Sequence, residues 1–466
     1  MSAIDVGSGA VQYSENSVAA SSAALSEEIF GLHDADVVRF IPVSRTDILN
    51  RLLAPEYWPG HDTKPLASVL YYIGRLRQQD SAIKLDELMD KYQLFNPDSD
   101  MEFAETLSDE EKLAQRNALI KNLEQLIFRA NFERITREEL ERVLSETSPY
   151  GVEIDVDLDE FAPLLPYYRG VRMRENSRRD WRWAYTRKRH YVIPSYERFF
   201  LALTLKPEEE RIAEIMKKEG VSRKFAERKF HKLRKRLPEW VNSEQIYLKM
   251  FKDIPQIDID MLLPNNGVKF RLFDRFMLWF SGGGSAVYAV VVSILKLLAV
   301  AISPILLFMT LFGVGGTLFR QVMSVINTRT RYMMELVQKL YFHNISSNQG
   351  ALTLLIDEAE EEDIKEDQLL YAFLLKQSPD DLSLDRARRD VAAFLLNEFR
   401  LKVNFDHEEA FGRLTQRNLA GRDANGKIWL MPPLQAARHL RDLWIEALDL
   451  RAGSATLLDA SHQPGG

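Results

Sequence analysis

The stretch Phe276–Phe319, FMLWFSGGGSAVYAVVVSILKLLAVAISPILLFMTLFGVGGTLF, carries one formal charge, that of Lys296. A membrane-spanning helix needs about 20 apolar residues to cross ~30 Å of hydrocarbon. The stretch is too long for one ordinary span and barely long enough for two. It therefore predicts a protein organised around a membrane segment, which we place at residues 276–322.

Basic residues flank this stretch on both sides. They are Lys269, Arg271 and Arg275 before it and Arg320, Arg329 and Arg331 after it. Because an excess of Lys and Arg marks the cytoplasmic side of a span, this symmetry favours a helical hairpin with both ends on one side. Ser303-Pro304 can supply the turn, since the residue before proline is pushed out of the α region. A single span near Leu297–Leu318 and a re-entrant or interfacial hairpin are the alternatives, whereas a buried core helix rarely has this length without charge.

Composition predicts a folded chain of several domains. The 466 residues are 46% hydrophobic and 28% charged. The net charge of −7 hides two basic segments: Tyr167–Tyr191 has nine Lys/Arg against two acids, and Arg211–Arg236 has eleven against three. The absence of cysteine excludes disulfides, thiolate metal sites and cysteine nucleophiles. No signal peptide is recognisable in the first thirty residues, so membrane insertion would depend on the internal segment.

The chain before residue 150 is predicted to be mostly helical. Ser44 is a helix N-cap residue, followed at Asp47 by an acid that favours the helix dipole. Capping boxes at Ser108–Glu111 and Thr136–Glu139 each begin a further helix. From Val152 to Leu205, β-branched and aromatic residues at short spacing predict antiparallel strands. A basic helical insertion follows at 208–237.

The C-terminal part is predicted to be winged-helix-like. Two helical patterns precede a turn at Asn425-Gly426, a strong hairpin signal, and Ile428–Leu430 returns as a strand. Residues 381–450 contain eleven basic and eleven acidic residues, so no basic stripe marks a nucleic-acid footprint and we do not expect nucleic acid as a partner. The predicted fold class is thus α+β, mostly helical, anchored in a membrane by an apolar helical hairpin and ending in a winged-helix-like domain.

These patterns give the predicted domain boundaries. They are 1–35 for a disordered tail, 36–150 for a helical N-terminal domain, 151–275 for an α+β membrane-proximal domain with the basic insertion 208–237, 276–322 for the transmembrane hairpin, 323–380 for a helical segment, 381–450 for the winged-helix-like domain and 451–466 for a flexible tail.

Several short motifs together resemble the transmembrane protein 143-like family, uncharacterised membrane proteins of bacteria and mitochondria. The matching stretches are Arg39-Phe40-Ile41-Pro42-Val43-Ser44-Arg45, Lys249-Met250-Phe251-Lys252-Asp253-Ile254-Pro255, Met261-Leu262-Leu263-Pro264, Leu340-Tyr341-Phe342-His343-Asn344, Asn348-Gln349-Gly350, and Asp357-Glu358-Ala359-Glu360-Glu361 with Lys365-Glu366. The resemblance spans roughly residues 36–450. It implies a membrane protein with a cytosolic or matrix-facing body, and it implies no reaction.

Two sets of residues are candidate contact sites. The basic, aromatic segment is predicted to lie on anionic headgroups, where each cation contributes ~1 kcal/mol; its residues are Arg178, Arg179, Trp181, Arg182, Trp183, Arg187, Lys188 and Arg189. The alternatives are that these residues neutralise the chain's own acidic domains or that they have a nucleic-acid role. A narrow small-residue face is predicted to join transmembrane helices of a homo-oligomer; its residues are Ser285, Ala289, Ser293 and Lys296. The alternatives are that Lys296 snorkels while this face packs on the second arm, or that Lys296 lines a water-filled path.

The acidic run Asp357–Asp363 offers a possible metal site, because Asp357, Glu360 and Glu361 share one helical face. The competing interpretation is a solvated face with a Glu361–Lys365 pair at i,i+4 spacing. No catalytic motif is recognisable, and no cofactor is expected.

The sequence favours a membrane-anchored scaffold or regulatory protein that binds an unidentified protein partner through its soluble domains. An oligomeric channel and an enzyme with a dispersed site are the alternatives. The predicted location is a bacterial or mitochondrial inner membrane, with the soluble domains on the cytoplasmic or matrix side.

Overall fold

The computed structural model describes residues 38–99, 108–145, 152–179, 188–235, 237, 241–264, 267–270, 320, 323, 334 and 341–461. Contacts divide the chain into two compact units. The helical unit comprises Met1–Leu94, Phe103–Phe132 and Leu352–Gly466, and the sheet unit comprises Phe95–Glu102 and Glu133–Ala351. Each unit is thus assembled from segments far apart in the sequence.

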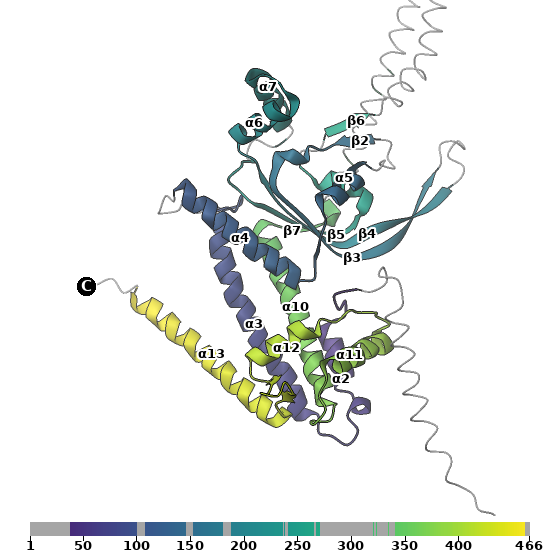
Figure 1. Ribbon diagram of the computed structural model, residues 1–466, viewed down its shortest axis with the longest axis vertical. Coiled ribbons are helices and arrows are strands. Elements are labelled where there is room, and N and C mark those ends of the chain that lie inside the picture. Colours follow the sequence, from purple (N-terminus) through teal and green to yellow (C-terminus); the bar gives the residue numbers. More distant parts are fainter. Residues whose placement is uncertain are drawn as a thin grey trace, which may run out of the picture. The chain divides into compact units, whose positions relative to one another are not determined.

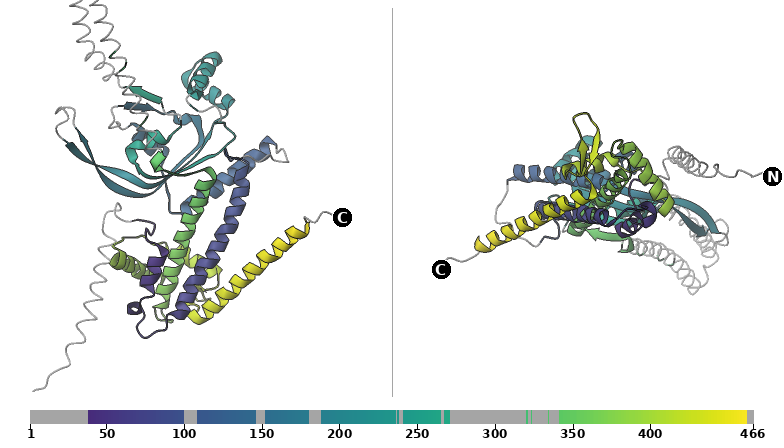
Figure 2. Two further views of the ribbon diagram at one scale, coloured as in Figure 1. Left: turned by 180° about the vertical axis from the view of Figure 1, so that it is seen from behind. Right: turned by 90° about the horizontal axis from the view of Figure 1, so that it is seen from below.

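Long helices form the helical unit (Figure 1). They are α2 (Arg45–Leu52), α3 (Lys64–Gln93), α4 (Asp109–Arg129), α10 (Asn348–Leu375, which begins in the sheet unit), α11 (Leu384–Phe399), α12 (His407–Gln416) and α13 (Pro433–Ser461), with a 3-10 helix, η2 (Pro55–Tyr57), and the hairpin β8 (Ala420–Arg422) and β9 (Ile428–Leu430). Helices α3 and α10 run side by side in both Figure 1 and Figure 2, and α13 packs against α3.

Local signals begin several of these helices as predicted. Ser44 accepts a hydrogen bond from the backbone N–H of Asp47 at the start of α2. Ser108 and Glu111 form both hydrogen bonds of a capping box at the start of α4. The β8–β9 hairpin turns at Gly426, whose φ of 79° favours glycine.

A five-stranded antiparallel sheet is the centre of the sheet unit. Its strand order is β1 (Glu133–Arg134), β3 (Phe161–Arg179), β4 (Lys188–Leu205), β5 (Tyr247–Pro255) and β7 (Asn344–Ser347). The central strand β4 carries the run FFLALTL, and because both of its faces are buried its apolar residues do not alternate with polar ones. One face packs on α5 (Arg137–Ser145) and the 3-10 helix η5 (Gln256–Leu262).

Smaller elements complete this unit. They are β2 (Val152–Asp155) paired with β6 (Gly267–Phe270), the 3-10 helix η3 (Leu158–Glu160), and the helices α6 (Glu208–Glu219) and α7 (Arg223–Arg234). Thr136 and Glu139 form the predicted capping box before α5, through Thr136 N–H to Glu139 Oε2 (2.9 Å) and Glu139 N–H to Thr136 Oγ1 (3.2 Å).

The predicted membrane-anchored fold and membrane localisation need correction. Among the helices that the structure describes, none is both long enough and apolar enough to cross a bilayer. The longest, α3, α10 and α13, carry charged side chains along their length, whereas a span needs about 20 apolar residues. The architecture of the described residues is α+β. The predicted hairpin segment 276–322 falls almost entirely outside these residues.

The predicted C-terminal winged-helix-like domain is also corrected. Its helices α11 and α12 and its hairpin are present, but they do not close over a core of their own. Phe394, Leu414 and Ile428 instead belong to one apolar cluster with Ile48 of α2 and Leu70 of α3. Tertiary packing has joined this segment to helices from the other end of the chain.

We predict that Asn348 stabilises the sheet unit through its backbone and its side chain together. It is buried, has a φ of 49°, accepts a hydrogen bond from Leu248 N–H (3.1 Å) and donates one to Asp98 (2.7 Å). Asn348→Ala should cost ~3 kcal/mol in urea unfolding, because the Leu248 N–H loses its acceptor and alanine is strained at positive φ. Asn348→Gly should cost ~1 kcal/mol less; equal losses would contradict the backbone contribution.

Candidate functional site

The acidic segment of α10 is buried in the helical unit. The side chains of Glu362, Asp363, Glu366 and Asp367 all lie in the interior, with residue exposures of 2–6%. Burying an unpaired carboxylate is very costly, so each of these groups needs a partner. The partners of Asp363, Glu366 and Asp367 come from three other helices.

Arg413 of α12 lies at the centre of these carboxylates. Its Nε donates to Asp367 (2.7 Å), its Nη2 donates to Glu366 (2.6 Å), and its Nη1 lies 3.2 Å from Asp363. The planar guanidinium can bond several carboxylates at once, which a lysine ammonium cannot do in the same geometry. One side chain therefore joins α12 to about one turn of α10.

Two further arginines complete this buried ion network. Arg77 of α3 donates to the second oxygen of Asp367 (3.0 Å). Arg129, the last residue of α4, pairs with Asp363. The network thus links α3, α4 and α12 to the same face of α10.

A separate contact joins α10 to the N-terminal part of this unit. Glu362 accepts a hydrogen bond from Ile41 N–H (2.8 Å), and Lys365 Nζ donates to Ile41 C=O (2.9 Å). Glu362 and Lys365 also pair with each other at 3.2 Å. Two of the motifs quoted above, around Ile41 and around Lys365, are therefore in direct contact.

Burial shifts the protonation of this network. It raises the pKa of Glu366 to about 8, although Arg413 acts in the opposite direction. It also raises the pKa of Asp367, again against Arg413 and Arg77. Burial opposes the charge of Arg413, but Asp367, Asp363 and Glu366 raise the pKa of its guanidinium, which stays protonated.

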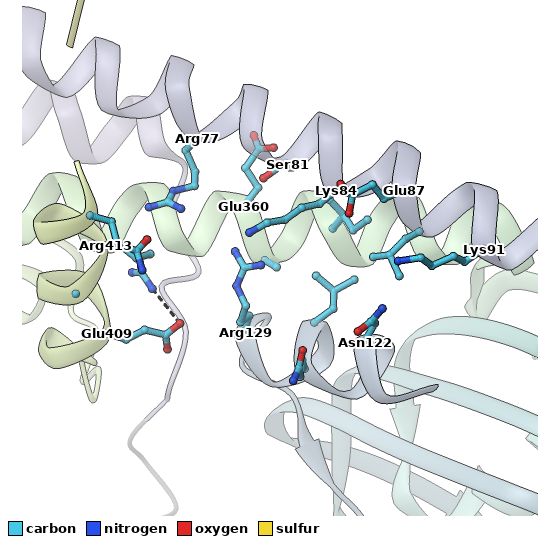
Figure 3. Close-up of a pocket in the computed structure, with 17 residues that line it drawn as sticks. Arg77, Ser81, Lys84, Glu87, Lys91, Asn122, Arg129, Glu360, Glu409 and Arg413 are labelled. Carbon is cyan, nitrogen blue, oxygen red and sulfur yellow. Dashed lines mark ion pairs between the residues drawn. The ribbon is translucent and has the colours of Figure 1, made fainter. Parts of the chain in front are cut away.

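A cavity of about 590 Å³ lies beside this network, between α3, α4, α10 and α12 (Figure 3). Its lining mixes polar and apolar surface and carries more cations than carboxylates. The lining residues are Arg77, Ser81, Lys84, Glu87, Leu88, Lys91, Asn122, Gln125, Leu126, Arg129, Ile356, Ala359, Glu360, Glu409, Gly412, Arg413 and Gln416.

Lys84 and Lys91 differ from the arginines of the cavity. Neither lysine makes an ion pair within the described parts of the chain, whereas Arg77, Arg129 and Arg413 all do. Partial burial, and then the charges of Arg129 and Arg77, lower the pKa of Lys84. In Figure 3 the side chains of Lys84 and Arg129 point toward each other across the cavity. This crowding of cations favours an anion between them.

The alternative metal site on α10 finds no support among the described residues. No cluster of three or more His, Cys, Asp or Glu side chains there has a metal-binding arrangement. Glu361 instead lies near Lys365 (3.8 Å) and accepts from Arg45 N–H (3.3 Å). Burial raises the pKa of Glu360, which lines the cavity.

The predicted membrane-surface residues are only partly described. The backbones of Arg178 and Arg179 on β3 pair with Arg189 and Lys188 on β4. Trp181, Arg182, Trp183 and Arg187 lie outside the described residues, as do the predicted helix-contact residues Ser285, Ala289, Ser293 and Lys296. The homo-oligomer remains a prediction.

Sequence reasoning missed the cavity and the ion network. One signal could have found the network: the acids of α10 stand between two apolar segments, Leu352–Ile356 and Leu369–Leu375, of one helix. Because those segments are apolar around much of the helix, the acids between them must be largely enclosed. The arginines that pair with these acids, Arg77, Arg129 and Arg413, are far apart in the sequence, and no local pattern identifies them.

The comparisons with known proteins concern the sheet unit. Residues 185–350 match a family model described as "Protein of unknown function (DUF3754)", which covers less than half of the chain. No solved structure matches the chain. The family match, and the lack of a long apolar helix among the described residues, correct the resemblance to the transmembrane protein 143-like family.

We predict that Arg413→Met destabilises the protein by about 3–5 kcal/mol, because it leaves buried carboxylates without their shared partner. Urea unfolding measures this loss. Arg441→Met is the control: Arg441 makes an exposed ion pair with Asp442, and its removal should cost less than about 0.5 kcal/mol. Similar losses for the two variants would show that the network contributes no more than a surface pair.

The raised pKa of Glu366 predicts a pH dependence of stability. A carboxyl whose pKa is higher in the folded than in the unfolded protein favours folding when protonated. Its contribution is present below its ordinary pKa of 4.5 and is lost as the pH rises toward about 8. Calorimetry from pH 4.5 to 8 should therefore show the wild type losing stability relative to Glu366→Gln. Glu110→Gln, at an exposed carboxylate, should stay parallel to the wild type; a parallel Glu366→Gln curve would contradict the shift.

Proposed function

We propose that this protein is a regulatory binding protein whose helical unit takes a small organic anion in the cavity between α3, α4, α10 and α12. One observation carries the proposal: Lys84 and Lys91 line the same cavity as Arg129 without a carboxylate partner of their own among the described residues. Burial first, and then the charges of Arg129 and Arg77, lower the pKa of Lys84 against Asp80 and Asp363, and an anion in the cavity would offset both lowering effects.

The size and chemistry of the cavity fit such a ligand. About 590 Å³ lies within the usual range of ~300–1,000 Å³ for small-molecule sites. The amides of Asn122, Gln125 and Gln416 can bond neutral polar groups, and Leu88 and Leu126 offer apolar contact. Cations, amides and a few apolar side chains together suit a phosphorylated or polycarboxylate metabolite.

Ligand binding can be transmitted through Arg129. This residue is the last of α4, and it pairs with Asp363 of the buried network. A ligand anion would compete with Asp363 for the same guanidinium. Because the network joins four helices, this competition gives the ligand a route to alter their packing and hence the surface offered to a partner protein.

The test is calorimetric titration of the full chain with inorganic pyrophosphate and, separately, citrate. We expect binding of at least one, because Lys84, Lys91 and Arg129 place cations around the same cavity. Lys84→Gln/Lys91→Gln should weaken binding at least tenfold. The matched control, Lys112→Gln/Lys121→Gln, removes two lysine charges from α4 outside the cavity and should leave binding unchanged.

Two results would overturn the proposal. One is that neither anion binds the wild type. The other is that the cavity and control variants weaken binding equally, which would assign the effect to net charge rather than to the cavity.

A further inference from the structure

Helices α6 and α7 form a helix–turn–helix in the sheet unit. Each helix has 12 residues, and Gly220, Val221 and Ser222 connect them. Gly220 ends α6 with a φ of 64°, a left-handed conformation that glycine adopts without strain. A short glycine-containing turn between two helices is the arrangement of helix–turn–helix motifs.

The pair has its own small core. Ile212 and Ile215 of α6 pack on Ala226 and Phe230 of α7, and all four are buried. The inner face of α7 is therefore apolar and is buried against α6. Only its outer face is available to a partner.

Helices α6 and α7 are drawn with the sheet unit in Figure 1. Ion pairs and hydrogen bonds fix them to the rest of that unit. Arg211, itself 4% exposed, bonds Asp157 at 2.5 Å and Glu160 at 3.4 Å. Lys218 pairs with Asp159 at 2.7 Å. Arg234 donates to the carbonyl of Lys206 at 3.0 Å. The motif is thus presented in one orientation by buried and half-buried contacts.

A cationic stripe lies on the outer face of α7. Lys224, Arg228 and Lys232 recur every four residues, so they stack along one side at ~6 Å intervals, opposite Ala226 and Phe230. All three are exposed, and none makes an ion pair within the described residues. Lys235, just after the helix, falls on the same side.

Several other charges of the motif are paired within it. Arg223 pairs with Glu209 (2.8 Å) and Glu227 (2.9 Å), and Lys229 pairs with Glu219. These three carboxylates therefore pair with cations other than Lys224, Arg228 and Lys232.

We propose that α6–α7 binds double-stranded DNA, with α7 placed in the major groove. That groove is ~12 Å wide and admits an α-helix. In helix–turn–helix proteins the second helix enters the groove by its N-terminal residues. Here those residues include Lys224 and the 53% exposed Phe225, which can contact a base edge while the stripe contacts phosphates.

This surface is separate from the segment that argued against nucleic acid. The charge balance of residues 381–450 concerns the helical unit, and the stripe belongs to the sheet unit. A-form RNA offers a narrow major groove that side chains cannot read, so the proposed placement favours DNA over double-stranded RNA.

The test is fluorescence anisotropy of the full chain with a labelled 24-base-pair DNA duplex between 50 and 200 mM KCl. Lys224→Gln/Arg228→Gln/Lys232→Gln should weaken binding at least tenfold and reduce the slope of log K against log salt by about 2–3, at ~0.9 per lost phosphate contact. Phe225→Ala should weaken binding without changing that slope.

A matched control removes the same charge elsewhere. Lys64→Gln/Lys112→Gln/Lys121→Gln also deletes three cations, all outside the motif, and should leave the slope unchanged. Thermal unfolding should be the same for both triple variants, because none of the substituted side chains is buried.

Three outcomes would overturn the proposal. The stripe variant and the control variant could bind the DNA duplex equally tightly, which would show that the cations of α7 do not contribute to DNA binding. Double-stranded RNA of the same length could bind as tightly as DNA, which excludes placement in the major groove. Polyglutamate could compete as well as DNA per unit charge, which would assign the stripe to an acidic protein.

Discussion

The contact of Arg413 with three carboxylates of α10 is the constraint on which the helical unit depends. A buried ion pair is expensive to form because both charges lose water, so close ion-pair geometry and additional hydrogen bonds must compensate for that loss. Here α12 supplies the guanidinium, α10 supplies the carboxylates, and α3 and α4 contribute a second and a third arginine. The acids of α10 can be interior only if all four helices are in place, so the network selects this packing over others.

The candidate site follows from that constraint. The same network forms one wall of the cavity, through Arg77, Arg129 and Arg413. Carboxylates of the network pair with all three arginines. Burial first, and then the charges of Arg129 and Arg77, still lower the pKa of Lys84. In this cavity the arginines are paired with carboxylates, whereas Lys84 and Lys91 have no such partner in the part of the chain that the structure describes. The two lysines therefore favour a negatively charged ligand.

The sheet unit is stabilised by its apolar central strand, and it supports the α6–α7 motif. Its central strand β4 is apolar on both faces, and β3 and β5 cover its edges by hydrogen bonding along most of their lengths. This rigid sheet gives the small α6–α7 motif a base that its own four-residue core could not provide. The basic character of the motif can then be concentrated on one exposed face.

The sequence by itself determined the local elements: the caps at Ser44, Ser108 and Thr136, the strands between residues 152 and 205, and the turn at Gly426. Those features depend on hydrogen bonds and backbone preferences of residues a few positions apart, so a short stretch of sequence is enough to predict them. Tertiary structure alone decided that the acids of α10 are buried, that C-terminal helices share a core with α2 and α3, and that lysines and arginines from α3, α4 and α12 surround one cavity. Those contacts join residues up to more than three hundred positions apart, such as Ile41 and Lys365. Their free energy depends on burial and partner geometry, and neither quantity is encoded in a short stretch of chain.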